Sequence, residues 1–141
     1  NLHEAECYAK SQGKPLFIDF TGYACVNCRK MEDNIWPDSR VYQFLSEKYV
    51  VVSLYVDDKK ELPAEQQVTD AQGRRVKTYG NVWSNIEADY YQQNSQPLYV
   101  LIDDDGKLLA PPRGYTPDAA KYADYLQKGL DVFEKRKAGT K

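Results

Sequence analysis

The sequence is poor in cysteine and methionine and has no long apolar run. Only three cysteines and one methionine occur in its 141 residues. Three cysteines are too few for a disulfide framework, and their odd number leaves at least one of them unpaired within the chain. No apolar run approaches the roughly 20 residues that a membrane-spanning helix needs. The chain does not begin with Met and has no basic-then-apolar leader, so we expect a mature form or an excised piece.

An excess of charge of either sign is also missing. The chain has 19 Lys+Arg and 21 Asp+Glu, a net charge of −2. This balance gives no electrostatic footprint for nucleic acid or for an anionic membrane surface, so neither is expected as a partner. Aromatic residues are plentiful, with 12 Tyr, 4 Phe and 2 Trp, which argues against disorder. Length and composition together predict one globular domain over residues 1–141.

The pattern of apolar residues predicts helices that alternate with strands. The predicted strands are residues 15–20, 49–56, 98–102 and 107–109, the last two joined by a turn at 103–106. The first three predicted helices cover residues 2–12, a stretch from Cys25 to Pro37, and residues 39–48. A fourth helix has Val82, Trp83, Ile86 and Tyr90 on its apolar side. Thr116 is predicted to cap the final helix, with Pro117 in its first position. The apolar runs at 15–20 and 98–102 are continuous, which is typical of strands covered on both faces. This order predicts an α/β protein built around a layered sheet.

A polar stretch of about two dozen residues, 57–80, separates the strongest strand from the next helix. Residues 68–69 and 75–76, on either side of Gly73, are predicted to form a small hairpin. A connection of this length is usually an insertion or a functional loop.

The residues with the clearest chemistry are Cys25 and Cys28, which follow a buried strand and open a helix. Two intervening residues on a first helical turn bring the two sulfurs within reach of a disulfide. The free amides and the positive dipole end of a helix favour the thiolate of the first cysteine. Cys25 is therefore predicted to be the exposed nucleophile and Cys28 the buried thiol that resolves the mixed disulfide.

The alternative for the same two cysteines is half of a zinc site. A closed structural site needs four ligands, and the remaining candidates are Cys7 and His3, which share a helix face at i and i+4. The position after a strand and at a helix start favours the redox interpretation, so no metal is expected. Cys7 lies off the apolar stripe of its helix and is predicted to be an incidental, partly exposed thiol.

The stretch from Lys14 to Glu32, KPLFIDFTGYACVNCRKME, resembles the active-site region of thioredoxin-like proteins, and more narrowly the C-terminal periplasmic domain of the DsbD family. The resemblance extends to Gln96-Pro97 before a strand and to the Asp103-x-x-Gly106 turn after it. It implies a thioredoxin-like three-layer sandwich, in which helices flank a central mixed sheet. The chain departs from the family pattern at Ala24, where an aromatic residue often precedes the first cysteine, and in the long 57–80 segment.

The same resemblance implies roles for two carboxylates. Asp19, six residues before Cys25, would lie in the strand beneath the motif. A partly buried carboxylate has a raised pKa and can take the proton from Cys28 as that thiol attacks. Glu32, one helical turn after Cys28, either shares this work or is an exposed helix carboxylate.

A substrate-binding surface is also implied by the resemblance. Pro97 would form a cis peptide bond and pack against the disulfide, which leaves the backbone of Gln96 free to pair with a substrate strand. Tyr23 is interpreted either as part of the docking surface or as an exposed turn residue. The remaining residues assigned to this surface are Ala24, Val26 and Asn27.

The resulting prediction is a protein-disulfide reductase that needs no cofactor besides its Cys25–Cys28 pair. By resemblance, it would act in the periplasm as a domain of a larger inner-membrane protein. It would take electrons from a membrane-embedded donor domain and pass them to oxidised exported proteins or thioredoxin-like acceptors, with a link to cytochrome c biogenesis. The isolated domain is expected to be a monomer. The alternative is a thioredoxin-like module that binds unfolded or partner chains, with the cysteine pair idle.

Overall fold

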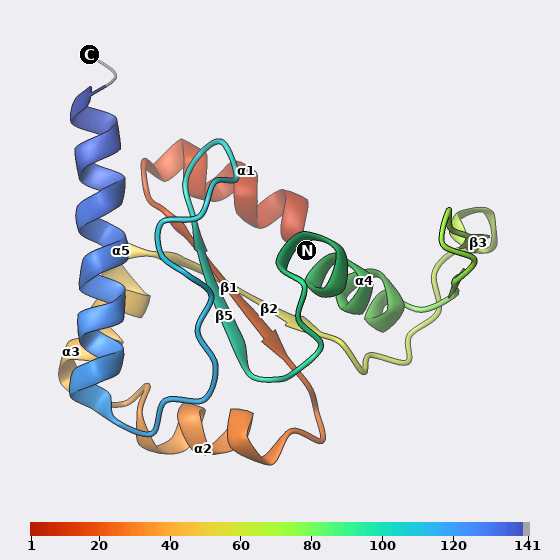
Figure 1. Cartoon of the computed structure of the whole chain (residues 1–141), viewed down its shortest axis with the longest axis horizontal. Coiled ribbons are helices and arrows are strands. Elements are labelled where there is room, and N and C mark those ends of the chain that lie inside the picture. Colours follow the sequence, from red (N-terminus) through yellow and green to blue (C-terminus); the bar gives the residue numbers. More distant parts are fainter. Residues whose placement is uncertain (140–141) are drawn as a thin grey trace.

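The computed structural model describes residues 1–139 and centres on a three-stranded mixed sheet (Figure 1). The strands are β1 (Leu16–Thr21), β2 (Val50–Tyr55) and β5 (Leu98–Ile102), in the order β2-β1-β5. β1 runs parallel to β2, with Asp19 opposite Ser53, and antiparallel to β5, with Phe20 opposite Leu98. Every residue of β1 and β5 is buried, as their continuous apolar runs predicted.

Helices cover both faces of this sheet, because alternate residues of β1 point to opposite sides. The helices are α1 (Leu2–Gln12), α2 (Val26–Asn34), α3 (Ser39–Gln43), α4 (Tyr79–Tyr91) and α5 (Ala119–Gly139). On one face Phe17 packs with Met31 of α2, Val41 of α3 and Leu126 of α5. On the other face Ile18 packs with Ala9 of α1 and Trp83 of α4. The result is the predicted thioredoxin-like sandwich, with α1 and α4 on one side of the sheet and α2, α3 and α5 on the other (Figure 1).

The 57–80 insertion carries the small hairpin that the sequence predicts. Its strands are β3 (Val68–Thr69) and β4 (Arg75–Val76), and a short 3-10 turn, η2 (Ala64–Gln66), precedes them. The hairpin projects beyond α4 (Figure 1). Arg74 anchors it there, because its guanidinium pairs with Asp70 at 2.8 Å and with Asp89 of α4 at 2.9 Å.

Two predicted boundaries of the final segment are wrong. The strand expected at 107–109 is a single bridge between Ile102 and Leu108, flanked by backbone hydrogen bonds from Asp103 to Lys107 and from Leu109 to Leu101. Pro111 and Pro112, which have no N–H, follow it and do not extend this pairing. The last helix begins at Ala119, and its cap is Asp118, whose carboxylate accepts a hydrogen bond from the backbone N–H of Lys121 at 3.0 Å. The hydroxyl of Thr116, the predicted cap, instead donates to the carbonyl of Gly114.

Two further helices differ in detail from their predicted forms. The helix predicted over 39–48 is α3 followed by a π-helical turn, η1 (Phe44–Lys48). α4 begins before Val82, because the side chains of Thr78 and Asn81 form a capping box at its start. Tyr90, expected on the apolar side of this helix, is 73% exposed, and Tyr91 packs on the core in its place. Within residues 1–139, none of the helices combines the length and apolarity needed to cross a membrane.

Candidate active site

Cys25 and Cys28 form a disulfide at the start of α2, with their Cα atoms 5.2 Å apart. Cys25 is the N-cap residue and has an extended backbone, and its Sγ accepts a hydrogen bond from the backbone N–H of Cys28 at 3.1 Å. This amide and the positive end of the helix dipole would stabilise a thiolate on Cys25 after reduction. Cys28 is only 2% exposed, whereas Cys25 is half-buried. Cys28 is thus buried, as predicted, whereas Cys25, which was expected to be exposed, is half-buried; the roles assigned to the two cysteines stay predictions.

The loop before Cys25 is held by Asp57, which follows β2. Its two carboxylate oxygens accept hydrogen bonds from the backbone N–H groups of Tyr23 at 2.9 Å and Ala24 at 3.2 Å. Burial acts in the opposite direction, but these hydrogen bonds keep the pKa of Asp57 below its ordinary value. The Tyr23 ring stacks on Tyr55 with a centroid distance of 4.1 Å. Asp57 and Tyr55 thus connect the loop to the end of the central parallel strand pair.

The outer surface around the disulfide is partly apolar. Tyr23 is 61% exposed and Val26 is 66% exposed, and Ala24 and Asn27 are also exposed. Their positions fit the predicted docking surface, which stays a prediction.

Asp19 lies in the middle of β1 and is only 2% exposed, so the predicted burial of this carboxylate is confirmed. Its Oδ2 accepts a hydrogen bond from the Ser53 hydroxyl at 3.0 Å. Burial raises the pKa of Asp19 from 3.8 to about 7, the Ser53 hydrogen bond lowers it, the nearby Glu32 charge raises it and Arg29 lowers it. A pKa near neutrality suits a group that accepts and returns a proton.

Glu32 is an ion-pair partner of Arg29. Arg29 Nη2 lies 2.9 Å from Glu32 Oε2 and also donates to the hydroxyl of Thr21 at 3.0 Å. The Glu32 side chain is 29% exposed, so it is neither a fully buried carboxyl beside Cys28 nor a fully exposed helix carboxylate. Glu32 thus lies close enough to influence Asp19, but its role in proton transfer stays a prediction.

Gln96 and Pro97 immediately precede β5, and the peptide bond between them is cis, as the resemblance implies. Because β5 begins opposite Phe20, near the end of β1, this segment lies at the same end of the sheet as the loop that leads to Cys25 (Figure 1). The side-chain amide of Gln96 donates to Oε1 of Glu87, a buried residue of α4, at 2.8 Å.

The four residues of the zinc alternative are not assembled. Cys7 Sγ lies 3.8 Å from His3 Nε2 on α1, and Cys7 is exposed and free. Across the described part of the chain, no three His, Cys, Asp or Glu side chains are grouped to hold a metal ion.

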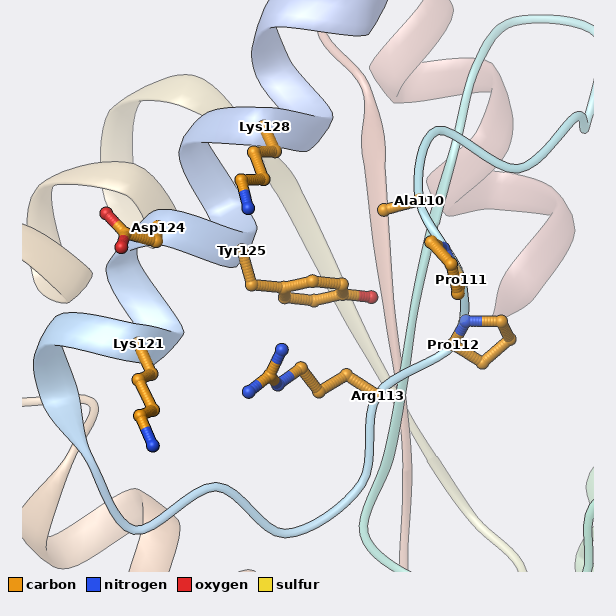
Figure 2. A pocket seen from close by; sticks show the side chains of 8 residues that line it. All are labelled: Ala110, Pro111, Pro112, Arg113, Lys121, Asp124, Tyr125 and Lys128. Atoms are coloured by element: carbon orange, nitrogen blue, oxygen red, sulfur yellow. The ribbon is translucent and has the colours of Figure 1, made fainter.

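A basic hollow of about 340 Å³ lies between the segment after Leu109 and helix α5 (Figure 2). Arg113, Lys121 and Lys128 line it, and the guanidinium of Arg113 lies 5.7 Å from the centre of the Tyr125 ring. Figure 2 shows the carboxylate of Asp124 turned away from this ring. None of the residues predicted to act on thiols lines this hollow.

Sequence reasoning missed four residues that contact the predicted site: Ser53, Arg29, Asp57 and Glu87. Two of them leave a signal in the sequence. Ser53 interrupts an otherwise apolar strand, and Glu87 stands four residues from both Trp83 and Tyr91, on the helix side that faces the core. Asp57 and Arg29 lie among other charged residues and leave none.

A disulfide between Cys-x-x-Cys sulfurs, at the start of a helix that follows a buried strand, is the site of a thiol–disulfide oxidoreductase. The thioredoxin-like domain model matches residues 2–130. The chain therefore belongs to the thioredoxin-like family.

Solved structures give the same fold. DsbH oxidoreductase is 27% identical over 92% of this chain and 81% of its own, with a TM-score of 0.67. A thioredoxin from Thermus thermophilus is 19% identical over 89% of this chain and 80% of its own, with a TM-score of 0.62. The oxidised C-terminal domain of DsbD from Neisseria meningitidis is 14% identical over 90% of each chain, also with a TM-score of 0.62. Comparison with curated proteins gives no match.

Proposed function

We propose that this protein is a protein-disulfide reductase in which Cys25 is the nucleophile and Cys28 the resolving thiol. The observation that carries the proposal is the disulfide itself, with half-buried Cys25 at the helix start and Cys28 buried behind it. In the reduced protein, the Cys25 thiolate attacks one sulfur of a substrate disulfide and the other substrate sulfur leaves as a thiolate. Cys28 then attacks Cys25 Sγ, which releases the second substrate thiolate and leaves the Cys25–Cys28 disulfide. Two electrons thus pass from the protein to the substrate.

Asp19 is the proposed acceptor for the proton of Cys28. A buried thiol has a raised pKa and attacks only after it loses its proton. Asp19 is buried in β1, and its pKa of about 7 allows the carboxylate to take a proton at neutral pH. Glu32 would influence this transfer through its charge and through its ion pair with Arg29.

An extended peptide around the substrate disulfide would dock beside the cis-proline segment. Backbone pairing with Gln96 would hold the peptide, and the exposed side chains of Tyr23 and Val26 would contact it. Ala24 and Asn27 would complete the rim of this surface. No cofactor is needed, because the cysteine pair stores both electrons.

The proposed partners are a membrane-embedded donor that reduces the Cys25–Cys28 disulfide and exported proteins or thioredoxin-like acceptors that receive the electrons. The resemblance of residues 14–32 to the DsbD family is what suggests these partners, together with a periplasmic location as part of a larger membrane protein. The structural likeness to DsbH oxidoreductase and to a DsbD C-terminal domain supports the shared fold. The isolated domain would act as a monomer.

Single-turnover kinetics with the pre-reduced protein and a peptide disulfide tests the mechanism. Cys25→Ser should abolish reduction, whereas Cys28→Ser should accumulate a mixed disulfide with the peptide. Cys7→Ser is the matched control, because Cys7 is an exposed free thiol on α1, and it should react at the wild-type rate. Full activity of Cys25→Ser would overturn the mechanism. Peptide binding without any reduction, unchanged by loss of both cysteines, would favour a binding module instead.

The direction of electron flow needs a separate measurement. Equilibrium titration against glutathione gives the reduction potential, and we expect a value toward the reducing end of the roughly −270 to −120 mV spanned by related proteins. A reduction potential near the oxidising end of this range would exclude a function as a reductase.

A further inference from the structure

Glu87 of α4 is a completely buried carboxyl at the boundary between the core and the predicted substrate-binding segment. Its relative exposure is 0%, and it lies one helical turn from Trp83 and from Tyr91, both of which pack on the core. Placing a carboxyl in such surroundings costs free energy unless hydrogen bonds compensate. The position therefore calls for a partner.

Glu87 has one such partner in the described structure, Gln96. The Gln96 side-chain amide donates to Oε1 at 2.8 Å, while the buried Oε2 has no hydrogen-bond partner within residues 1–139. Burial raises the pKa of Glu87 from 4.5 to about 7, and the bond from Gln96 lowers it. Within the described residues, only one of the two carboxyl oxygens is hydrogen-bonded, and its partner is the residue before the cis-proline.

Packing alone does not account for a carboxyl at this position. Apolar side chains in place of both Glu87 and Gln96 could fill the same space without desolvating a carboxyl, and the exchange of both partners of a buried polar pair is often neutral or stabilising. What the carboxyl adds is a fixed acceptor for the Gln96 side chain. Gln96 lies in the connection between α4 and β5, so this bond fixes the segment that leads into the sheet.

We propose that Glu87 is a positioning residue for peptide substrates: by holding the Gln96 side chain, it keeps the Gln96–Pro97 segment in the conformation that receives an extended peptide chain. The proposal rests on the proposed function, since it assigns Gln96 and Pro97 to substrate docking. It makes Glu87 important for disulfides embedded in a peptide and unimportant for small disulfides, which have no backbone to pair.

The test compares two disulfides in single-turnover reactions of pre-reduced protein. One is a peptide of about ten residues with a central disulfide-bonded cysteine, long enough to pair as an extended strand. The other is the small aromatic disulfide 5,5′-dithiobis(2-nitrobenzoic acid).

Two variants of Glu87 are compared with the wild-type protein. Glu87→Met removes the acceptor at similar volume, and Glu87→Gln keeps an acceptor oxygen. We expect Glu87→Met to raise the half-saturating peptide concentration about tenfold, which is the scale of one lost hydrogen bond. The maximal rate and the rate with the small disulfide should stay unchanged, and Glu87→Gln should restore peptide binding.

A second pair of variants separates positioning from general damage. Gln96→Met removes the donor, so the double variant Glu87→Met/Gln96→Met should bind the peptide no more weakly than the worse of the two single variants. Additive effects, equal slowing of both disulfides or an unchanged half-saturating concentration in Glu87→Met would each overturn the proposal. Failure of the wild-type protein to reduce either disulfide would instead overturn the proposed function.

Discussion

The hydroxyl of Ser53 donates a 3.0 Å hydrogen bond to Oδ2 of Asp19 across the parallel pair formed by β1 and β2. Asp19 is buried, whereas Ser53 is exposed on β2, an edge strand of the three-stranded sheet. A buried carboxyl is thereby linked to the edge of the sheet. The other ionisable groups that influence Asp19 or are influenced by it come from three elements: Arg29 and Glu32 of α2, Tyr99 of β5 and Tyr122 of α5.

Replacing Ser53 with alanine should raise the pKa of Asp19 above its value of about 7, because the hydroxyl stabilises the ionised carboxylate. Loss of one hydrogen bond to a charged group predicts an increase of about one pH unit. An NMR titration of the Asp19 carboxyl carbon in the oxidised protein measures it. Ser53→Thr, which keeps the hydroxyl, is the control, and an identical titration of Ser53→Ala and wild type would contradict the prediction.

Replacing Glu32 with glutamine should shift the same pKa in the other direction. The negative charge of Glu32 raises the pKa of Asp19, and its removal also releases Arg29 from the ion pair. We expect a decrease of about half a pH unit, as befits a partly screened charge. Asp33→Asn makes the same change of net charge at an exposed neighbouring position of α2. If both variants shift Asp19 equally, the effect reflects net charge and not the Glu32 side chain.

The pKa of Asp19 also predicts how stability depends on pH. The pKa of an unperturbed aspartate is 3.8, whereas that of Asp19 in the folded protein is about 7. The folded state therefore binds this proton more tightly than the unfolded state does. The stabilisation is complete below pH 4 and is lost as the pH rises through 7, by on the order of 4 kcal/mol in total. Asp19→Asn has no such proton, so its free energy of unfolding should fall less between pH 4 and pH 8. Urea denaturation of the two oxidised proteins at several pH values measures the difference, and parallel pH profiles would show that Asp19 is not desolvated.

The sequence predicts those features of the fold that depend on local patterns. The continuous apolar runs at 15–20 and 98–102 predict the buried strands β1 and β5, and Gly73 marks the hairpin in the insertion. Residues whose role depends on register or on distant neighbours escape such reasoning. Ser53 becomes relevant only when β1 and β2 are aligned, and Asp57 only when the end of β2 is placed beside the loop at Tyr23. The apolar pattern from Val82 onward sets no start for α4, which begins at Tyr79 and includes Gly80, where contact with the backbone after β2 requires a glycine.

Gly80 occupies the first turn of α4, against the backbone that follows β2. A Cβ atom at this position would lie 2.7 Å from the carbonyl oxygens of Val56 and Asp58 and 2.8 Å from the Asp58 nitrogen. Backbone atoms cannot rotate away as a side chain can, so Gly80→Ala requires a shift of the helix or of residues 56–58. The free energy of unfolding should fall by about 2 kcal/mol, as for other overpacked sites.

The same displacement should reach the active site. Asp57 lies within the displaced segment and holds the backbone of Tyr23 and Ala24, so the loop before Cys25 should lose its anchor. We therefore expect Gly80→Ala to lower both the melting temperature and the rate at which the reduced protein attacks a disulfide. Gly139→Ala is the control, because within residues 1–139 a Cβ there has no atom within 4 Å apart from its chain neighbours and the backbone of its own helix. If Gly80→Ala is as stable as the wild-type protein, α4 is not in tight contact with the backbone after β2. If the variant loses stability but keeps its reactivity, Asp57 does not transmit the displacement to the loop before Cys25.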